Sequence, residues 1–244
     1  MSFSIQEDHP TNSQADNDIL AHVLDGYRFQ VSTDSETAAR ALNVRREVYS
    51  GKGYGVPVPD SYDHRSWILA AEHVQSGRIV GTMRLTPRWS GPFECEEYFN
   101  VPDGLRGRLS VELNRFAILP GFRKGATFFP TVSLGLFKLA HDFLCRMGAE
   151  YMVIASRPQQ LWTYQWMRFA STGLVAKYGK LADSEHELLA YDFVRRAAIL
   201  EGHPFRDFFL QARYAEVLLP ADTPRLDIVA GLPPADRWPI AVGQ

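Results

Sequence analysis

The chain has 244 residues, 45% of them hydrophobic and 22% charged, which is enough to bury one sizeable core. Its formal net charge of -2 excludes the basic composition of a general nucleic-acid-binding protein, so no nucleic acid partner is expected. No apolar run reaches the roughly 18 residues of a membrane span, and the histidines show no metal-binding spacing, so neither an integral membrane segment nor a metal site is expected. Two distant cysteines, Cys95 and Cys145, favour a cytoplasmic location.

The first predicted elements follow a polar N-terminal arm, residues 1–22, which has few groups able to join a core. A strand is predicted from Gly26 to Ser32. A capping-box signature that starts at Thr33 predicts a helix running to about Ser50. Arg45 falls in the apolar stripe of this helix, so we expect it to point inward and to need a carboxylate partner.

Three strands are predicted next. A loop rich in glycine and proline, Gly51 to Pro59, separates the helix from the first of them. Ser66 to His73 and Arg78 to Thr86 form a predicted hairpin, and Leu109 to Leu119 is the strand after it. Residues 87 to 108 show no regular period and are expected to be irregular or partly helical.

Charged side chains occur in two of these strands and just before them. Arg84 lies in the hairpin, Glu112 and Arg115 lie in the following strand, and Asp60 and Asp63 precede the hairpin. Buried charges are costly unless they are paired or used. The pattern predicts one polar site built across a sheet. A plain ion-pair network for the arginines and a turn for the aspartates remain alternative interpretations.

Strand geometry constrains the residues between Glu112 and Phe116. In a regular strand Glu112 and Asn114 share one face with Phe116, whereas Arg115 points to the opposite face. Glu112 and Arg115 therefore cannot both touch one substrate unless the strand contains a bulge. We expect Glu112 in a reaction cleft and Arg115 in a separate group of charges. The expected group joins Arg115 with Arg45, Arg84, Asp60 and Asp63.

The second half of the chain alternates helices and strands. A core-facing helix is predicted from about Phe129 to Met147, followed by a buried strand from Tyr151 to Ala155. An aromatic-rich helix is predicted from Pro158 to about Ser171, and a last core strand from Leu188 to Val194. Aromatic side chains of these helices can line an acyl pocket or belong to the core. The pocket candidates are Phe143, Trp162 and Trp166.

Strands and helices in this mixed order predict an α/β or α+β sandwich around a largely antiparallel sheet. The domain is expected to span residues 23–195, between the arm at 1–22 and a C-terminal extension at 196–244. The extension contains an amphipathic helical stretch and ends in a proline-rich tail.

Four charged motifs occur in order along the chain: Arg45-Arg46-Glu47-Val48-Tyr49, Asp60-x-Tyr62-Asp63, Gly81-x-x-Arg84-Leu85 and Glu112-x-x-Arg115-Phe116. With them the chain resembles, over about residues 26 to 195, the acyl-homoserine-lactone (autoinducer) synthases and their relatives, the long-chain N-acyl amino acid synthases. The resemblance implies the fold of the Gcn5-related N-acetyltransferases, a three-layer sandwich with a central mixed, mostly antiparallel sheet. Lactone synthases usually carry Trp where this chain has Tyr54, and Ser or Thr where it has Asn114. These differences favour the N-acyl amino acid synthase branch.

The resemblance implies an N-acyltransferase that moves a fatty acyl group from a thioester to the amine of an amino acid or similar acceptor. Because an ammonium group has no lone pair, a base must first take its proton, and Glu112 is the candidate. The group of charges is expected to anchor the loop over the acceptor site and to bind the acceptor's carboxylate. No bound cofactor is implied, since the thioester is a co-substrate carried by the phosphopantetheine of an acyl carrier protein or by coenzyme A.

An acyl carrier protein is the favoured donor, because the full glycine pattern for holding a pyrophosphate is missing before the long helix. Basic residues would contact this acidic partner, unless they form only a solvated basic turn. The candidates are Arg106, Arg108, Arg123 and Lys124. Two other functions stay open: a quorum-sensing lactone synthase that uses S-adenosylmethionine, and a non-catalytic acyl-binding module.

Overall fold

The computed structural model describes residues 20–125, 129–179, 184–223 and 225. Within these residues one eight-stranded sheet has the strand order β6-β7-β5-β4-β3-β2-β1-β8. The pairs β4/β5 and β1/β8 are parallel and the other neighbours are antiparallel, which confirms the predicted mixed, mostly antiparallel sheet. Of the expected arm at residues 1–22, residues 1–19 lie outside the described residues, as does the tail after residue 225, whereas Leu20 is buried in the core.

The strands are β1 (Tyr27–Val31), β2 (Trp67–His73), β3 (Arg78–Pro87), β4 (Ser110–Ile118), β5 (Tyr151–Ser156), β6 (Ala170–Tyr178), β7 (Ser184–Asp192) and β8 (Val217–Leu218). The longer helices are α2 (Ser35–Ser50) and α3 (Thr131–Met147), and the shorter ones are α4 (Leu161–Trp166), α5 (Arg196–Ile199) and α6 (Arg206–Leu210). Asp34 caps α2, because its side chain accepts a hydrogen bond from the N–H of Thr37 at 2.7 Å. The helix therefore begins one residue later than the capping signature indicates.

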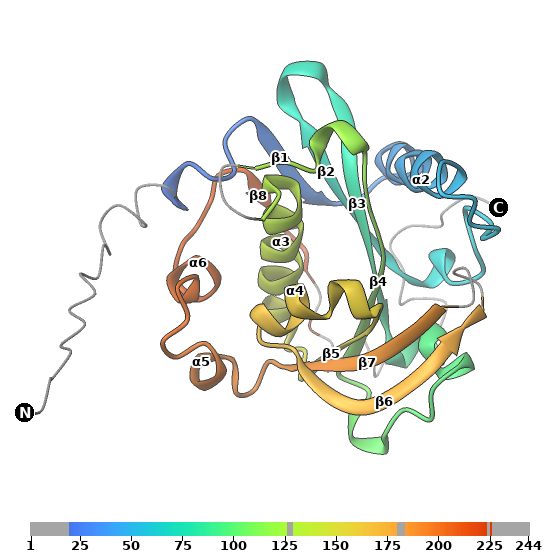
Figure 1. Cartoon of the computed structure of the whole chain (residues 1–244). Coiled ribbons are helices and arrows are strands. Elements are labelled where there is room, and N and C mark those ends of the chain that lie inside the picture. The colour runs from blue at the N-terminus through green and yellow to red at the C-terminus, as the bar shows by residue number, and fades with distance from the viewer. Residues whose placement is uncertain (1–19, 126–128, 180–183, 224, 226–244) are drawn as a thin grey trace, which may run out of the picture.

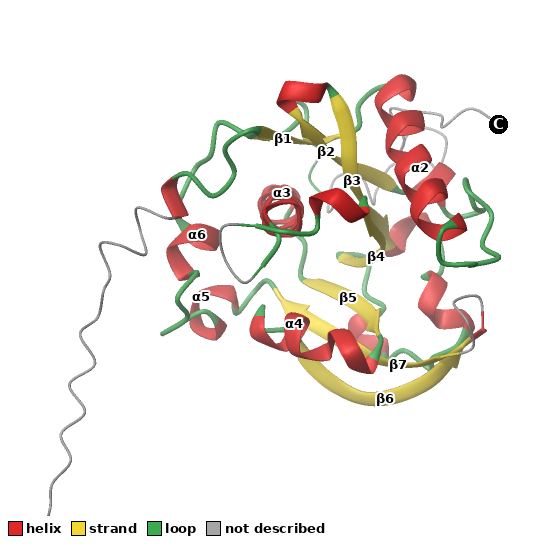
Figure 2. Ribbon diagram, turned by 45° about the horizontal axis from the view of Figure 1, so that its top comes forward, coloured by secondary structure: helices red, strands yellow, loops and turns green. Residues whose placement is uncertain are grey.

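The two longer helices cover opposite faces of the sheet (Figure 2). α2 packs on β2, β3 and β4, whereas α3 packs on β1, β2 and β3. Gly81 of β3 faces α3, because a Cβ at this position would lie 2.5 Å from Cγ1 of Val132. Side chains alternate along a strand, so Arg84 faces α2, where it meets Asp63, the partner of Arg45.

β4 and β5 are paired only at their beginnings. Their register runs from Ser110 opposite Tyr151 to Glu112 opposite Val153. Beyond Glu112 the two strands separate (Figure 1). The second halves of β4 and β5 are therefore not hydrogen-bonded to each other as strands.

A β-bulge interrupts β4 at Arg115. Thr82 pairs with Ala117 but Arg84 pairs with Asn114, so β4 has one residue more than β3 between these two pairs. Arg115 has a φ of 55°, a left-handed conformation that costs a residue with a side chain on the order of 1–3 kcal/mol. The bulge places the guanidinium of Arg115 on the α2 side of the sheet. With this bulge, Arg115 and Glu112 can reach the same substrate, which a regular strand would not allow.

The same bulge turns Phe116 to the other side of the sheet. Its ring lies 5.7 Å from that of Phe137 on α3. The prediction that Phe116 shares the face of Glu112 and Asn114 is therefore wrong, because one inserted residue reverses the alternation of side chains.

The segment 158–178 also differs from the prediction. The predicted helix ends at Trp166, as α4, and β6 begins at Ala170. Arg168, with a φ of 68°, lies in the turn between them. The first residues of β6, such as Ser171, are small and polar, so the sequence shows no apolar alternation that would indicate a strand.

The first part of the C-terminal extension shares the main hydrophobic core. Leu200 and Phe208 are buried in it, and β8 pairs with β1. The buried Lys138 of α3 donates a hydrogen bond to Asp142 at 2.8 Å and another to the carbonyl oxygen of Phe209 on α6 at 3.4 Å. α6 thus packs against α3 (Figure 1).

Candidate active site

A cavity of about 110 Å³ lies where β4 and β5 separate. The wall contributed by β5 includes Ile154 and Ala155, and β4 contributes the polar residues singled out in the sequence. From β4 these are Glu112, Asn114 and Arg115, and the apolar Phe116 lies beside them. Other wall residues include Tyr49, Lys52, Tyr54, Glu94, Arg157, Gln160, Tyr164, Tyr178 and His186.

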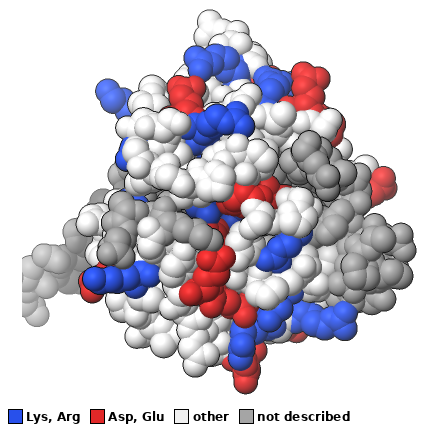
Figure 3. Space-filling model, turned by 90° about the vertical axis from the view of Figure 1, so that its right-hand side faces the viewer, with Lys and Arg blue, Asp and Glu red and all other residues white. Residues whose placement is uncertain are grey.

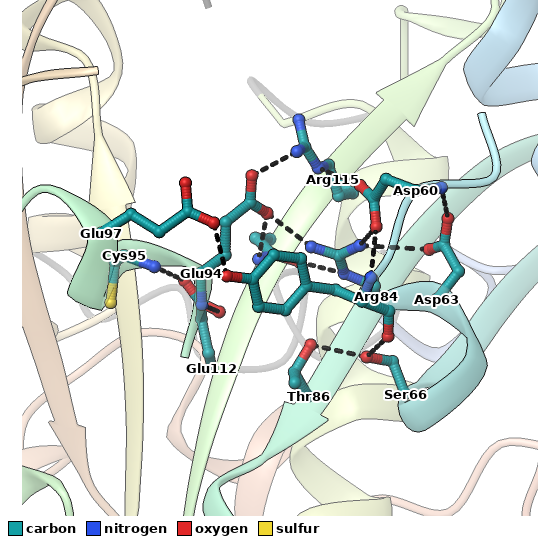
Figure 4. Close-up of polar contacts among 12 residues, drawn as sticks. Asp60, Asp63, Ser66, Arg84, Thr86, Glu94, Cys95, Glu97, Glu112 and Arg115 are labelled. Carbon is teal, nitrogen blue, oxygen red and sulfur yellow. Dashed lines mark hydrogen bonds and ion pairs between the residues drawn. The ribbon is translucent and has the colours of Figure 1, made fainter. Parts of the chain in front are cut away.

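Glu112 is only 1% exposed, yet it lines this cavity. Its Oε2 accepts a hydrogen bond from the backbone N–H of Glu94 at 2.8 Å, and its Oε1 accepts one from that of Cys95 at 2.9 Å (Figure 4). Burial and the negative charge of Glu94 raise the pKa of Glu112 to about 7, while Arg84 and the two N–H groups act in the opposite direction. Such a carboxyl group is suited to exchange a proton near neutral pH.

A buried cluster of three arginines and three carboxylates lies beside the cavity. Figure 4 shows its members Asp60, Asp63, Arg84, Glu94 and Arg115. Arg84 is at its centre: it forms ion pairs with Asp60, Asp63 and Glu94, and its Nε donates to Asn114 at 2.8 Å. Each side chain of the cluster is at most 7% exposed, so the charges compensate one another out of contact with bulk water. The members of this charge cluster are Arg45, Asp60, Asp63, Arg84, Glu94 and Arg115.

Glu94 is the member that the sequence does not single out. It is 1% exposed and accepts hydrogen bonds from Arg84, Asn114 and Arg115. Its own N–H holds Glu112, so Glu94 links the charge cluster to the candidate base. Charge balance was the available signal in the sequence for a further carboxylate. The expected group has three arginines but only two aspartates, so one more carboxylate is needed for neutrality.

Arg115 belongs to the charge cluster and also lines the cavity. Its Nη2 donates to Glu94, and its Nε lies 3.1 Å from Oδ2 of Asp60. Its buried Nη1 has no hydrogen-bond partner within the described part of the chain. Since buried donors are nearly always satisfied, this group is available to an oxygen of a bound ligand.

Arg157 and Tyr54 form a contact at the cavity wall. The Nη1 of Arg157 donates to the hydroxyl of Tyr54 at 2.7 Å, and the guanidinium carbon lies 5.0 Å from the centre of the tyrosine ring. The Nζ of Lys52 lies 5.7 Å from the same ring centre. Two cationic side chains outside the charge cluster therefore border the cavity.

The three aromatic residues expected in an acyl pocket lie elsewhere. Phe143 is buried in the core, with its ring 5.3 Å from that of Trp67. Trp162 and Trp166 share one side of α4 and pack on Phe129. None of the three is in the cavity wall; the opposite side of α4 supplies Tyr164 to it instead.

The four basic residues expected to contact a carrier protein do not form one patch. Arg106 and Arg108 precede β4 whereas Arg123 and Lys124 follow it, and a strand of nine residues, roughly 30 Å long, separates the two pairs. Arg106 forms an ion pair with Asp103, and Arg123 donates to a backbone carbonyl. On the described surface in Figure 3, basic and acidic side chains are interspersed.

The residues that the structure describes contain no group of three or more His, Cys, Asp or Glu side chains placed to hold a metal ion. None of their helices combines the length and the apolar character needed to cross a membrane.

Comparisons with known proteins bear on this site. Residues 40–192 match the family model of the N-acyl amino acid synthase FeeM, whereas a search of curated proteins found no match. The solved structure of FeeM, from uncultured soil microbes, is similar with a TM-score of 0.61 at 14% identity, over 72% of this chain and 96% of that one. The structure of BjaI, a CoA-dependent acyl-homoserine lactone synthase, with SAM and isopentyl-CoA, is similar with a TM-score of 0.58 at 19% identity, over 79% of this chain and 97% of that one. The structure of the AHL synthase LasI is similar with a TM-score of 0.51 at 18% identity, over 67% of this chain and 88% of that one. These similarities confirm the expected N-acetyltransferase-like fold.

Proposed function

The chain belongs to the FeeM family of N-acyl amino acid synthases, and we propose that it transfers a fatty acyl group from a thioester to the amine of an amino acid. One observation carries the proposal within the site. Glu112, a buried carboxyl group whose pKa is raised to about 7, lines a cavity between two separating strands. A base of this kind, in the wall of a cavity, is what acyl transfer to an amine requires.

The reaction begins when Glu112 takes a proton from the acceptor's ammonium group, directly or through one water. Each Oε keeps a lone pair besides the one that its backbone N–H uses. The neutral nitrogen attacks the thioester carbon, which forms the C–N bond and an oxyanion. Collapse of this intermediate breaks the C–S bond. The departing thiolate takes up the proton that the new amide nitrogen gives up, and Glu112 releases its proton to solvent.

We assign recognition of the acceptor's carboxylate to Arg157 and Tyr54. The charge cluster pairs three arginines with three carboxylates, so as a whole it has no excess positive charge to offer a further anion. Arg157 lies on the cavity wall outside the cluster, and guanidinium–carboxylate contacts are strong and directional. Within the cluster, Arg115 also lines the cavity, and its Nη1 is one of the buried donors without a hydrogen-bond partner among the described residues.

We also propose that the acyl donor is an acyl carrier protein. The segment before α3 lacks the full glycine pattern with which acetyltransferases of this fold hold a pyrophosphate. The phosphopantetheine arm of a carrier protein presents the same thioester without that requirement.

Product analysis tests the proposal. The purified chain is incubated with fatty acyl carrier protein or with fatty acyl-CoA, together with the common amino acids, and new N-acyl products are identified by mass spectrometry. We expect an N-acyl amino acid, formed faster from the carrier protein. Methylthioadenosine and a lactone, formed when S-adenosylmethionine is supplied, would instead identify a lactone synthase. Failure to acylate any amine from either donor would contradict the proposed activity.

A further inference from the structure

A second cleft, of about 460 Å³, lies between the C-terminal half of α3 and the C-terminal extension. It shares no wall residue with the cavity at Glu112. Part of its wall comes from residues beyond 192, where the match to the family model ends. Nothing in the proposed acyl transfer uses this cleft.

Three arginines from three separate segments converge on the cleft. Arg146 lies in the last turn of α3, Arg196 begins α5 and Arg213 follows α6. Arg146 donates to the carbonyl of Ala221 at 2.9 Å, and Arg196 donates to that of Phe193 at 2.8 Å. Among the residues that the structure describes, none of the three arginines takes part in an ion pair.

The acidic residue of the wall does not compensate these charges. Asp142 is already bound to the buried Lys138, with 2.8 Å between Oδ1 and Nζ. The cleft therefore gathers three exposed positive charges that have no ion-pair partner among the described residues. An anion bound between the guanidinium groups would accept several charge-assisted hydrogen bonds.

The rest of the wall is apolar or buried. Apolar side chains cover one part of it, and His141, which is 4% exposed, adds a buried polar ring that lies 3.8 Å from the sulfur of Cys145. A purely inorganic anion would leave the apolar part in water, whereas a ligand with an apolar body would cover it. The apolar wall residues are Phe209, Leu210, Val217 and Leu219.

We propose that this cleft binds an amphipathic anion, with a carboxylate or phosphate head between Arg146, Arg196 and Arg213 and an apolar body on the C-terminal extension. The site is separate from the acyl-transfer cavity, with which it shares no wall residue. The proposal stands on the three convergent guanidiniums and does not depend on the activity proposed above.

Calorimetric titration of the full chain with octyl phosphate and with octanoate tests the proposal and separates the two head groups. We expect at least one of them to bind, and octanol, which has no charge, to bind at least about tenfold more weakly. Replacing Arg196 and Arg213 by Ala removes two charge-assisted contacts and is expected to weaken that binding at least about tenfold. The single variant R213A, which loses no hydrogen bond or ion pair among the described residues, should fold normally and weaken binding in the same direction.

The matched control replaces Arg195, which is exposed, and Arg206, which is half-buried and pairs with Asp207; both belong to the same extension and neither lines the cleft. This control variant should bind the octyl ligand as the unaltered chain does. Equal binding by the control and by the variant lacking Arg196 and Arg213 would overturn the proposal. So would the absence of binding of either anion to the unaltered chain.

Discussion

Charge compensation governs the site at the scale of single residues. A buried arginine in a helix and two more in strands indicated that carboxylates must lie close by, and Asp60 and Asp63 do lie there. Glu94 escaped prediction because it comes from a segment without helical or strand period, so nothing in its local sequence shows that it is buried. The partner of a buried charge is fixed by the tertiary fold, and the sequence shows only that one is missing.

Glu94 is expected to be essential for stability. The variant E94Q removes the negative charge between Arg84 and Arg115 and leaves two buried guanidiniums with less compensation, so we expect a loss of about 3–5 kcal/mol in the free energy of unfolding. Urea denaturation measures it. The control D103N alters a carboxylate that is 91% exposed in a surface ion pair and should change stability by less than about 0.5 kcal/mol. Equal effects of the two variants would contradict the compensating role of Glu94.

Arg157 is expected to determine acceptor specificity. If it binds the acceptor's carboxylate, R157A should raise KM for the amino acid roughly 10- to 100-fold and leave KM for the corresponding decarboxylated amine nearly unchanged. R157K should recover part of the difference because it keeps the charge. Steady-state kinetics with the two acceptors decides, since a merely structural role would raise both KM values together.

At the scale of elements, regular periodicity predicted most helices and strands and failed where the backbone departs from it. No glycine marks the bulge in the sequence of β4, because Arg115 adopts the positive φ although it carries a side chain. Its ion pairs with Glu94 and Asp60 hold this conformation, and such tertiary contacts are invisible in a single strand. Similarly, the aromatic run of α4 suggested a longer helix than the turn at Arg168 permits.

The contact between α3 and β1 depends on Gly135. A Cβ at this position would lie 2.0 Å from Cζ of Phe29, a ring with no exposed surface. G135A should therefore lower the free energy of unfolding by about 1–3 kcal/mol, although alanine favours helix by about 1 kcal/mol over glycine. Denaturant unfolding measures this loss, and the added variant F29L should recover part of it. G104A, which meets nothing within 4 Å, serves as the control and should be close to neutral.

At the scale of the whole molecule, the sheet and the first part of the C-terminal extension share one hydrophobic core. The sequence predicted the extension as a separate segment. Its amphipathic stretch shows that the extension packs against another part of the protein, but it does not show which part. The basic residues flanking β4 illustrate the same limit, since sequence proximity to one strand does not bring its two ends together.

A shared core predicts cooperative unfolding. Phe208 of α6 is 1% exposed and packs on Phe205, Phe209 and Tyr214, so F208A should cost about 3–5 kcal/mol. Because the extension is continuous with the core, circular dichroism during urea unfolding should show one transition at lower denaturant. A separate early transition, with the main one unmoved, would show that the extension unfolds independently.

The central claim is that Glu112 activates the acceptor amine, and thiol release from the acyl donor as a function of pH tests it most directly. The unaltered chain should release thiol only when an amine acceptor is present, with a kcat/KM that rises as pH passes through about 7, because Glu112 must lose its proton before it can act as a base. The variant E112Q should fold, retain donor binding and lose about 10²- to 10⁴-fold in this rate. Acceptor-dependent release that is as fast in E112Q as in the unaltered chain, with the same pH profile, would contradict the account.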